Sequence, residues 1–186
     1  AARSSASRSS RSTGSVIDIG AGCMLQGYMV KCGTSAQLSI GAQSKLDGVS
    51  GLPAIVIRKG GSILVDHHAK IIGTVILAEE SAQIKLGAFF GIGQGSTVRA
   101  ASSISIGDYC LASYGVQIYD TNSHSTDHLQ RRQYIEGSRS GLAFKEEVST
   151  APIVIGHDVW LGRDSAVLKG VLIADQCIVG MKTMVA

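Results

Sequence analysis

The sequence predicts an all-β fold, a parallel β-helix built from hexapeptide repeats with one protruding loop. The main observation is a column of aliphatic residues in which each member lies six positions after the previous one. The column consists of Ile155, Leu161, Val167, Ile173, Val179 and Val185. A six-residue period is typical of a parallel β-helix, in which each repeat is a short strand and a tight turn. An ordinary buried strand has a period of two, which does not explain six consecutive matches.

Small residues beside this column support the same fold. Gly156, Gly162 and Gly180 each follow a column residue, and Ala174 takes the fourth such place. Glycine lets the backbone bend sharply next to a side chain that points inward. The chain has 23 glycines and only 2 prolines, as many tight turns between short strands require.

Shorter columns extend the repeat toward the N-terminus. They are Leu86/Ile92/Val98/Ile104, Ile106/Ala112/Ile118, Ile57/Ile63/Ala69/Val75, Ile40/Leu46 and Ile19/Leu25. The phase shifts between columns indicate insertions or altered corners between coils. We therefore expect coils from near residue 16 to the end of the sequence.

Composition limits the domain organisation and the partners. The chain of 186 residues is 45% hydrophobic and 17% charged, which suits one solenoid domain with a continuous interior. Residues 1–15 are rich in Arg and Ser and contain no acid, so we expect a disordered leader there and the β-helix over 16–186. The last coil is incomplete by the repeat count, and we expect further structure beyond Ala186. A net charge of +3 does not favour nucleic acid, and the lack of a long apolar run argues against membrane insertion.

The cysteines indicate the compartment. Cys23, Cys32, Cys110 and Cys177 form no CxxC pair, and the last two fit small buried positions of the repeat. We expect free thiols in a reducing, cytoplasmic environment. A structural metal site needs its ligands grouped more closely, so we expect no metal.

Residues 119–152 interrupt the repeat, and the chain resumes its period at Ile153 after Pro152. Long loops of this kind in compact domains are often functional. The segment carries His124 and His128, with Asp120 and Asp127 nearby. An imidazole titrates near neutral pH and can accept a proton from an attacking hydroxyl or amine, and an aspartate can hold its other ring nitrogen. The segment is therefore the expected active-site loop.

Two runs carry a resemblance to a known family: IGDYCLASYGVQIYDTNSHSTD at 106–127 and APIVIGHDVWLGRDSAVLKGVLIADQCIVG at 151–180. They resemble the hexapeptide-repeat acyltransferases, in the branch like the maltose and galactoside O-acetyltransferases. The resemblance implies a left-handed β-helix, which the usual right-handed crossover rule does not give. It also implies a homotrimer with active sites between subunits and acetyl-CoA as acyl donor.

The resemblance implies roles for loop residues. His124 occupies the position of the family's general base, which deprotonates an acceptor hydroxyl so that it attacks the thioester directly. Asp127 or Asp120 is expected to orient this histidine. Arg131 and Asn122 are the candidate residues for binding the acceptor.

The resemblance also implies where acetyl-CoA binds. Trp160 matches the family's tryptophan and is expected to line the groove near the reacting end. The pantetheine arm is expected beside the small residues of successive coils, with lysines near the phosphates. The candidate residues are Trp160, Gly162, Arg163, Gly180, Met181 and Lys182, with Lys169 as a further lysine.

Positions at which this sequence differs from the family's pattern limit the choice of acceptor sugar. The maltose and galactoside enzymes carry asparagines for their sugar where this chain has glycines in the run Phe90-Gly91-Ile92-Gly93-Gln94-Gly95. The loop DTNSHSTD is more similar to that of enzymes that acetylate capsular polysaccharides or exopolysaccharides. We expect O-acetylation of a sugar hydroxyl in polysaccharide or glycoconjugate synthesis.

Three alternatives remain at this point. An N-acyltransferase of an amino sugar needs the same base. A metal enzyme resembling the γ-class carbonic anhydrases would need converging histidines, for which His67, His68, His124 and His128 are the candidates. A non-catalytic solenoid would use the loop for recognition.

Overall fold

The computed structural model describes residues 14–27, 30–48, 54–142 and 144–186. In this part of the chain the backbone winds through three parallel sheets of seven strands, which we call sheets A, B and C. Sheet A contains β1 (Val16–Ile19), β4 (Gln37–Ile40), β7 (Ser62–Val65), β10 (Gln83–Leu86), β13 (Ser103–Ile106), β16 (Ile153–Ile155) and β19 (Leu172–Ile173). Sheet B contains β2 (Met24–Gln26), β5 (Lys45–Asp47), β8 (Lys70–Ile72), β11 (Gly91–Ile92), β14 (Leu111–Ala112), β17 (Trp160–Leu161) and β20 (Ile178–Val179). Sheet C contains β3 (Val30–Cys32), β6 (Ile55–Ile57), β9 (Val75–Ala78), β12 (Thr97–Ala100), β15 (Gln117–Tyr119), β18 (Ala166–Leu168) and β21 (Met184–Val185).

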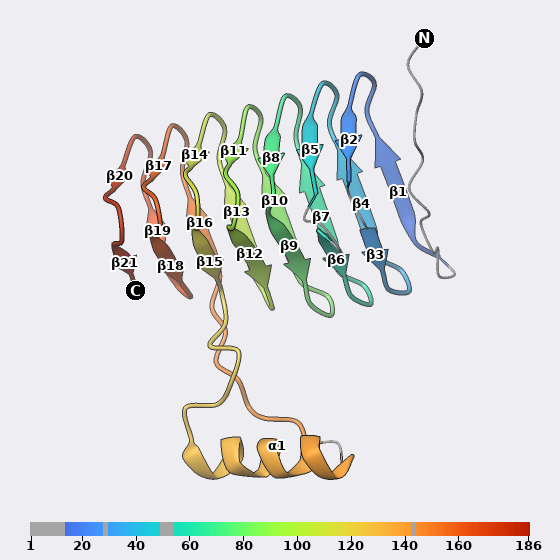
Figure 1. The fold of residues 1–186 in the computed structure, drawn as a ribbon, viewed down its shortest axis with the longest axis vertical. Helices are drawn as coiled ribbons and strands as arrows, with labels where there is room; N and C mark the ends of the chain where they lie inside the picture. Colours follow the sequence, from blue (N-terminus) through green and yellow to red (C-terminus); the bar gives the residue numbers. More distant parts are fainter. Residues whose placement is uncertain (1–13, 28–29, 49–53, 143) are drawn as a thin grey trace.

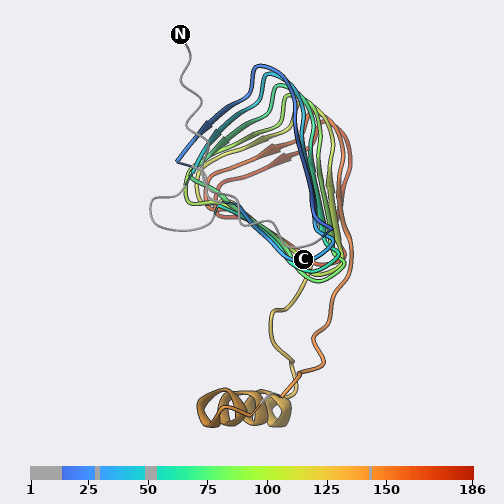
Figure 2. The same cartoon turned by 90° about the vertical axis from the view of Figure 1, so that its right-hand side faces the viewer.

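Each coil gives one strand to each sheet, and successive coils stack along one axis (Figure 1). Seen along that axis, the three sheets are the sides of a triangular prism (Figure 2). This arrangement confirms the predicted parallel β-helix. Residues 1–13 of the expected disordered leader lie outside the described residues.

The predicted aliphatic column lies inside the prism. Ile155, Leu161 and Val167 are 3% exposed or less. They pair in register with Ile173, Val179 and Val185 of the following coil, so a coil here holds three six-residue units. Stacking of like side chains buries apolar surface continuously along the axis, and this burial is the main stabilising contribution of the fold.

One predicted column is out of phase with the structure. Val75 is only half-buried and pairs with Thr97 on the outer face of sheet C. Its neighbours Thr74 and Ile76 are fully buried instead. The corner before them contains Gly73 at φ 53°, in the left-handed region. It is one residue shorter than the corner of the next coil, since Ile71 and Ile76 are five positions apart and their register partners Ile92 and Val98 are six apart.

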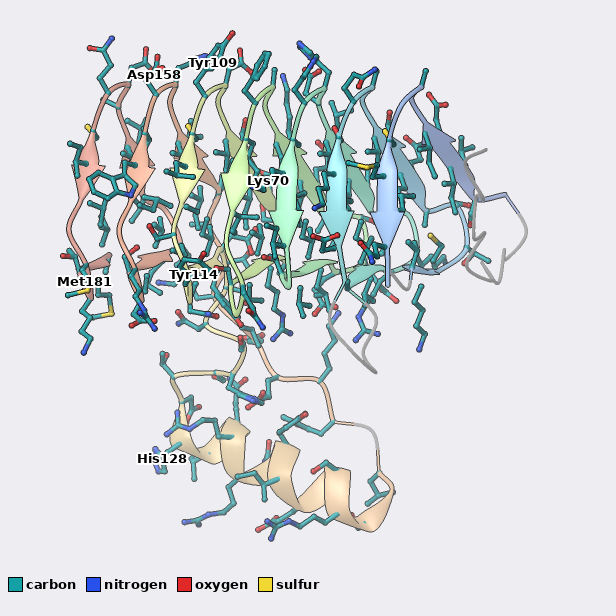
Figure 3. All side chains as sticks on the ribbon, turned by 45° about the horizontal axis from the view of Figure 1, so that its top comes forward. Lys70, Tyr109, Tyr114, His128, Asp158 and Met181 are labelled. Carbon is teal, nitrogen blue, oxygen red and sulfur yellow. The ribbon has the colours of Figure 1, made fainter. Side chains whose placement is uncertain are left out.

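The corner between sheets A and B, which we call the A–B edge, repeats one conformation from coil to coil. Its left-handed residues are Gly22, Gln43, His68, Phe89, Tyr109, Asp158 and Gln176. The rings of His68 and Phe89 stack at 4.7 Å between centroids, and those of Phe89 and Tyr109 stack at 4.9 Å. Figure 3 shows Tyr109 and Asp158 along this edge.

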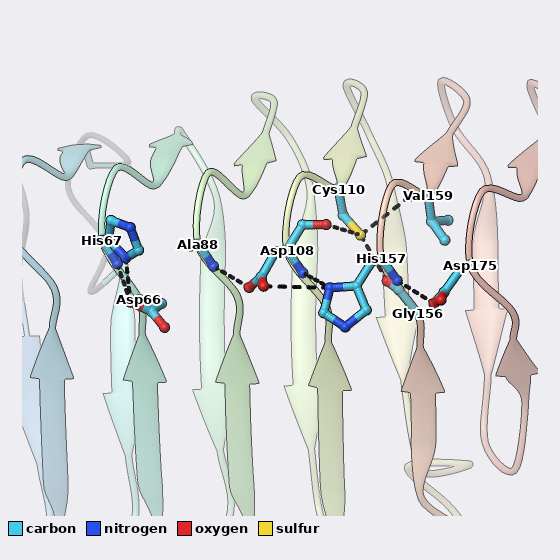
Figure 4. A network of polar contacts seen from close by, with 9 residues as sticks. All are labelled: Asp66, His67, Ala88, Asp108, Cys110, Gly156, His157, Val159 and Asp175. Carbon is cyan, nitrogen blue, oxygen red and sulfur yellow. Dashed lines mark hydrogen bonds and ion pairs between the residues drawn. The ribbon is translucent and has the colours of Figure 1, made fainter.

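Polar side chains on the A–B edge join neighbouring coils (Figure 4). An oxygen of Asp108 accepts a hydrogen bond from the backbone N–H of Ala88 at 2.8 Å, and Asp175 accepts one from His157 N–H at 2.8 Å. The thiol of Cys110 donates to the carbonyl of Gly156 at 3.0 Å. These bonds satisfy backbone groups that the tight corners leave without a ladder partner.

A helical arm leaves the prism between β15 and β16, at the corner between sheets C and A (Figure 2). It carries α1 (His128–Ser140), which begins after Asp127 and ends at Gly141 with φ 75°. We expected an irregular loop here, so the helix is a difference from the sequence prediction. No helix in the described part of the chain combines the length and the apolar character needed to span a membrane.

Candidate active site

Two antiparallel legs form the base of the arm. Thr121 makes an isolated bridge with Thr150, and the Asn122 N–H donates to the carbonyl of Ser149 at 3.1 Å. The Ala151 N–H donates to the Asp120 carbonyl at 3.0 Å. Residues before and after the helix therefore meet close to the coils, although they lie far apart in the sequence.

His124 lies on the first leg and contacts a glutamate from the second. Its Nδ1 lies 2.8 Å from Oε2 of Glu146. The glutamate side chain is 4% exposed, whereas that of His124 is 53% exposed. An ionised carboxylate only accepts hydrogen bonds, so this contact assigns a proton to Nδ1, and in the neutral ring Nε2 then carries the lone pair. The arrangement provides an oriented imidazole whose other nitrogen can accept a proton.

Tyr134 of α1 packs beside this pair. Its ring centroid lies 5.1 Å from that of His124, with the planes tilted by 57°. The helix is tied back to the legs by two further bonds. Gln130 Oε1 accepts from the Glu147 N–H at 2.9 Å, and Arg131 Nη1 donates to the Ser125 carbonyl at 2.7 Å.

Asp120 does not contact His124, which corrects one predicted partner. Its two oxygens accept hydrogen bonds from the backbone N–H groups of Ala101 and Ser102 at 2.6 and 2.8 Å. Burial raises the pKa of the Asp120 carboxyl above its ordinary value, and these hydrogen bonds oppose that rise. The residue fixes the start of the arm on the preceding coil.

Asp127 is also engaged elsewhere, which corrects the second predicted partner. Its Oδ1 accepts from the Leu129 N–H at 2.8 Å, and the residue is the N-cap of α1. An N-cap aspartate satisfies one of the free N–H groups at a helix start. Asp127 lies only three residues after His124 in the sequence, but its carboxylate caps the helix that begins at His128.

The candidate acceptor-binding residues lie on the same arm. Arg131 is half-buried and its guanidinium holds the turn at Ser125. Asn122 is exposed, and its backbone joins the two legs. Both therefore belong to the hydrogen-bonded base of the arm that also carries His124.

The predicted acetyl-CoA residues lie elsewhere on the prism. Trp160 is 48% exposed on the outer face of sheet B, and its indole N–H lies 3.3 Å from Ser113 Oγ. It stands in register between Leu111 and Ile178, two exposed apolar side chains. The arm that carries His124 leaves the prism at the corner between sheets C and A. Within one chain, Trp160 and His124 therefore lie on different sides of the prism.

Gly162, Arg163, Gly180, Met181 and Lys182 gather at the corner between sheets B and C. Figure 3 shows Met181 on this edge, with Tyr114 of an earlier coil. A Cβ on Gly162 would lie 2.6 Å from the Met181 backbone nitrogen.

The backbone N–H and carbonyl groups of Gly162 are both hydrogen-bonded within the coils. Its N–H donates to the Val179 carbonyl at 2.8 Å, and its carbonyl accepts from Ser165 N–H at 3.2 Å. Glycine at this position therefore permits coil stacking.

The histidines are dispersed in the structure. His67 and His68 lie on the A–B edge, where they contact each other and Phe89, and His67 Nδ1 lies 2.7 Å from Asp66. His128 lies on α1, apart from the coils (Figure 3). Across residues 14–27, 30–48, 54–142 and 144–186, no group of three His, Cys, Asp or Glu side chains is arranged to hold a metal ion.

Sequence comparison relates the chain to an acetyltransferase. It is 28% identical over 115 residues to a polysialic acid O-acetyltransferase of Neisseria meningitidis, a match that covers 60% of this chain. The aligned part is 48% of that relative, so the chain spans about half of its length. No protein-family model matches the sequence.

Solved structures show the same fold. The polysialic acid O-acetyltransferase OatWY superposes with a TM-score of 0.63 at 19% identity, covering 92% of this chain and 80% of that one. The polysialic-acid-specific acetyltransferase NeuO gives a TM-score of 0.57 at 18% identity, covering 94% and 79%. A hexapeptide-repeat acetyltransferase of Vibrio cholerae, crystallised with acetyl-CoA, gives 0.50 at 24% identity, covering 69% and 61%. These superpositions show the shared fold, and together with the sequence relative they confirm the resemblance to hexapeptide-repeat acetyltransferases.

Proposed function

We propose that this protein is an O-acetyltransferase that transfers the acetyl group of acetyl-CoA to a hydroxyl of a glycan, with His124 as general base. The observation that carries the proposal is the contact of 2.8 Å between His124 Nδ1 and buried Glu146, which leaves Nε2 available. The similarity to a polysialic acid O-acetyltransferase supports both the reaction and a glycan acceptor.

Acetyl-CoA supplies the acyl group as a thioester. Nε2 of His124 accepts the proton of the acceptor hydroxyl as its oxygen attacks the thioester carbonyl, and then returns that proton to the departing thiolate. Glu146 holds Nδ1–H and stabilises the imidazolium during this transfer. No net proton is gained or lost by the enzyme.

We further propose that acetyl-CoA binds along sheet B and the corner that follows it, at Trp160, Gly162, Arg163, Gly180, Met181 and Lys182. Trp160 offers an exposed aromatic face, and Met181 is 64% exposed. Arg163 and Lys182 are exposed cations suited to phosphates. On the arm, Arg131 and Asn122 are proposed to act at the acceptor side, and the four free cysteines suit a cytoplasmic enzyme.

A site that uses both His124 and Trp160 needs a second copy of the chain, because one copy holds them on different parts of the prism. We propose a homotrimer in which the arm of one subunit faces sheet B of the next. The test is complementation between His124→Ala and Trp160→Ala proteins. Mixed assemblies should regain activity that neither variant has alone, while a monomer in light scattering would contradict the proposal.

The base is tested by release of free thiol from acetyl-CoA in the presence of glycan acceptors. His124→Ala should lower kcat by about 10²–10⁴-fold. His128→Ala is the matched control, since His128 is an exposed histidine of the same arm. Unchanged turnover in His124→Ala, or loss of turnover on adding a chelator, would reject the proposed mechanism. Amino-sugar acceptors in the same panel separate O-transfer from N-transfer.

A further inference from the structure

A row of ion pairs runs along the outer surface toward the arm. Arg58 Nε lies 2.5 Å from Glu79 Oε2, and Arg99 Nη2 lies 2.8 Å from Glu79 Oε1. The Nε of Arg99 donates to the same oxygen at 3.2 Å. The three residues come from three successive coils, so the row extends along the prism axis.

Arg99 joins this row to the candidate active site. Its Nη1 donates to Ser123 Oγ at 3.3 Å, and Ser123 is the residue immediately before His124. Ser123 has φ 65°, in the left-handed region that non-glycine residues rarely adopt. The guanidinium is therefore fixed beside the turn that presents the proposed base.

Arg99 keeps unused hydrogen-bonding capacity. The bonds above use three of its five N–H groups, and the other two have no partner among the described residues. Its side chain is 33% exposed, and that of Arg58 is 56% exposed. Glu79 is shared between both arginines. Nearby Asp120 interacts electrostatically with Arg99, but its oxygens accept hydrogen bonds from backbone N–H groups of the preceding coil and not from the guanidinium. A guanidinium with free N–H groups binds carboxylates and phosphates well.

The surroundings of Arg99 suit a sugar. It stands on the outer face of sheet C in register between Leu77 and Tyr119, both half-buried. An aromatic ring and an aliphatic side chain beside a cation provide apolar contact for a sugar ring together with a charged anchor.

We propose that Arg99 binds the carboxylate of an acidic sugar acceptor while a hydroxyl of that acceptor lies at His124. This inference rests on the proposed function and narrows its substrate class to anionic glycans. A phosphate of acetyl-CoA offers the same chemistry, but the phosphates are at the far end of that molecule from the thioester. A group held next to Ser123 lies beside the reacting end, and this position favours the acceptor.

The experiment compares two acceptors that differ only at their carboxyl groups: a sialic acid oligomer and the same oligomer with these groups reduced to neutral alcohols. Initial rates of thiol release give KM and kcat for each acceptor and KM for acetyl-CoA. The variants are Arg99→Gln, which removes the charge, and Arg99→Lys, which keeps it. Lys85→Gln, an exposed cation of sheet A, is the control. Thermal unfolding is measured for every variant.

Arg99→Gln should raise KM for the acidic oligomer about tenfold or more, since a hydrogen bond to a charged group is lost, with little change in kcat. Arg99→Lys should recover part of this loss. The reduced oligomer should bind more weakly to the native enzyme and show no further change in Arg99→Gln. Lys85→Gln should behave as native.

Three results would overturn this inference while leaving the proposed function intact. They are equal KM for both oligomers in the native enzyme, an equal effect of Arg99→Gln on both, or an effect confined to KM for acetyl-CoA. Lack of thiol release with every glycan would instead reject the proposed function itself.

Discussion

Nδ1 of His124 lies 2.8 Å from Oε2 of Glu146, and this contact joins the two legs of an arm that leaves the β-helix. The residues flank helix α1, so the helix brings them together. Because the glutamate is buried and the imidazole is half-exposed, the pair has one protected face and one face open to a substrate. The predictions below test this relationship and the fold that supports it.

The first prediction concerns Glu146→Gln. The glutamine amide can donate to Nδ1, which would move the ring proton to Nε2 and block proton acceptance. We expect kcat to fall about 100-fold or more, with KM for acetyl-CoA little changed. Glu147→Gln is the matched control, since its side chain is exposed and adjacent in sequence. Steady-state kinetics of both variants measure the effect of each substitution on kcat. Equal kcat values for Glu146→Gln and Glu147→Gln would show that Glu146 does not position the base.

The second prediction separates Asp127 from the chemistry. Asp127→Ala removes the N-cap of α1 and should lower the free energy of unfolding of the arm by about 1 kcal/mol. Asp127→Ser keeps a capping oxygen and should retain near-native kcat. Hydrogen exchange of α1 amides and thiol-release rates measure the two effects. A loss of turnover in Asp127→Ser as large as that in Glu146→Gln would assign Asp127 a direct part in the reaction.

The third prediction concerns coil stacking at Gly107. A Cβ there would lie 2.6 Å from the carbonyl oxygen of Gly156 in the next coil, and backbone cannot move aside easily. Gly107→Ala should lower the free energy of unfolding by about 1–3 kcal/mol. At Gly91 an added Cβ meets only the Leu111 side chain, at 3.1 Å, so Gly91→Ala should change stability by less than about 0.5 kcal/mol. Denaturant unfolding compares them, and equal losses would contradict the stacking argument.

The fourth prediction concerns the reactivity of Cys110. Burial raises the pKa of this thiol, and the residue is 3% exposed. A raised pKa lowers the thiolate fraction at any given pH, so alkylation should begin at higher pH than for an ordinary cysteine. We expect Cys110 to remain unlabelled at pH 8 in the folded protein and to react after unfolding. Peptide mass spectrometry would detect it, with the half-buried Cys177 as comparison, and fast labelling of folded Cys110 would show that the corner opens.

The sequence alone determined the architecture. Ile155, Leu161 and Val167 recur every six residues because each coil side must place one aliphatic residue inside the prism, and such a period is visible without coordinates. It also located the interruption that carries His124. The Val75 column was out of phase because the corner at Gly73 has one residue fewer than the corner of the next coil, and the position of such a shortened corner depends on the backbone conformation.

Only the tertiary structure decided the partner of His124. Asp127 and Asp120 are close in sequence, but a helix cap and backbone N–H groups of the previous coil occupy their carboxylates. Capping signals for α1, Asp127 before it and Gly141 after it, were present in the sequence and could have indicated the helix. Nothing in the spacing could select Glu146, because its contact depends on how α1 folds back between the two legs. The hydrogen bond from Arg99 to Ser123 could not be predicted from the sequence either, because it joins residues of different coils.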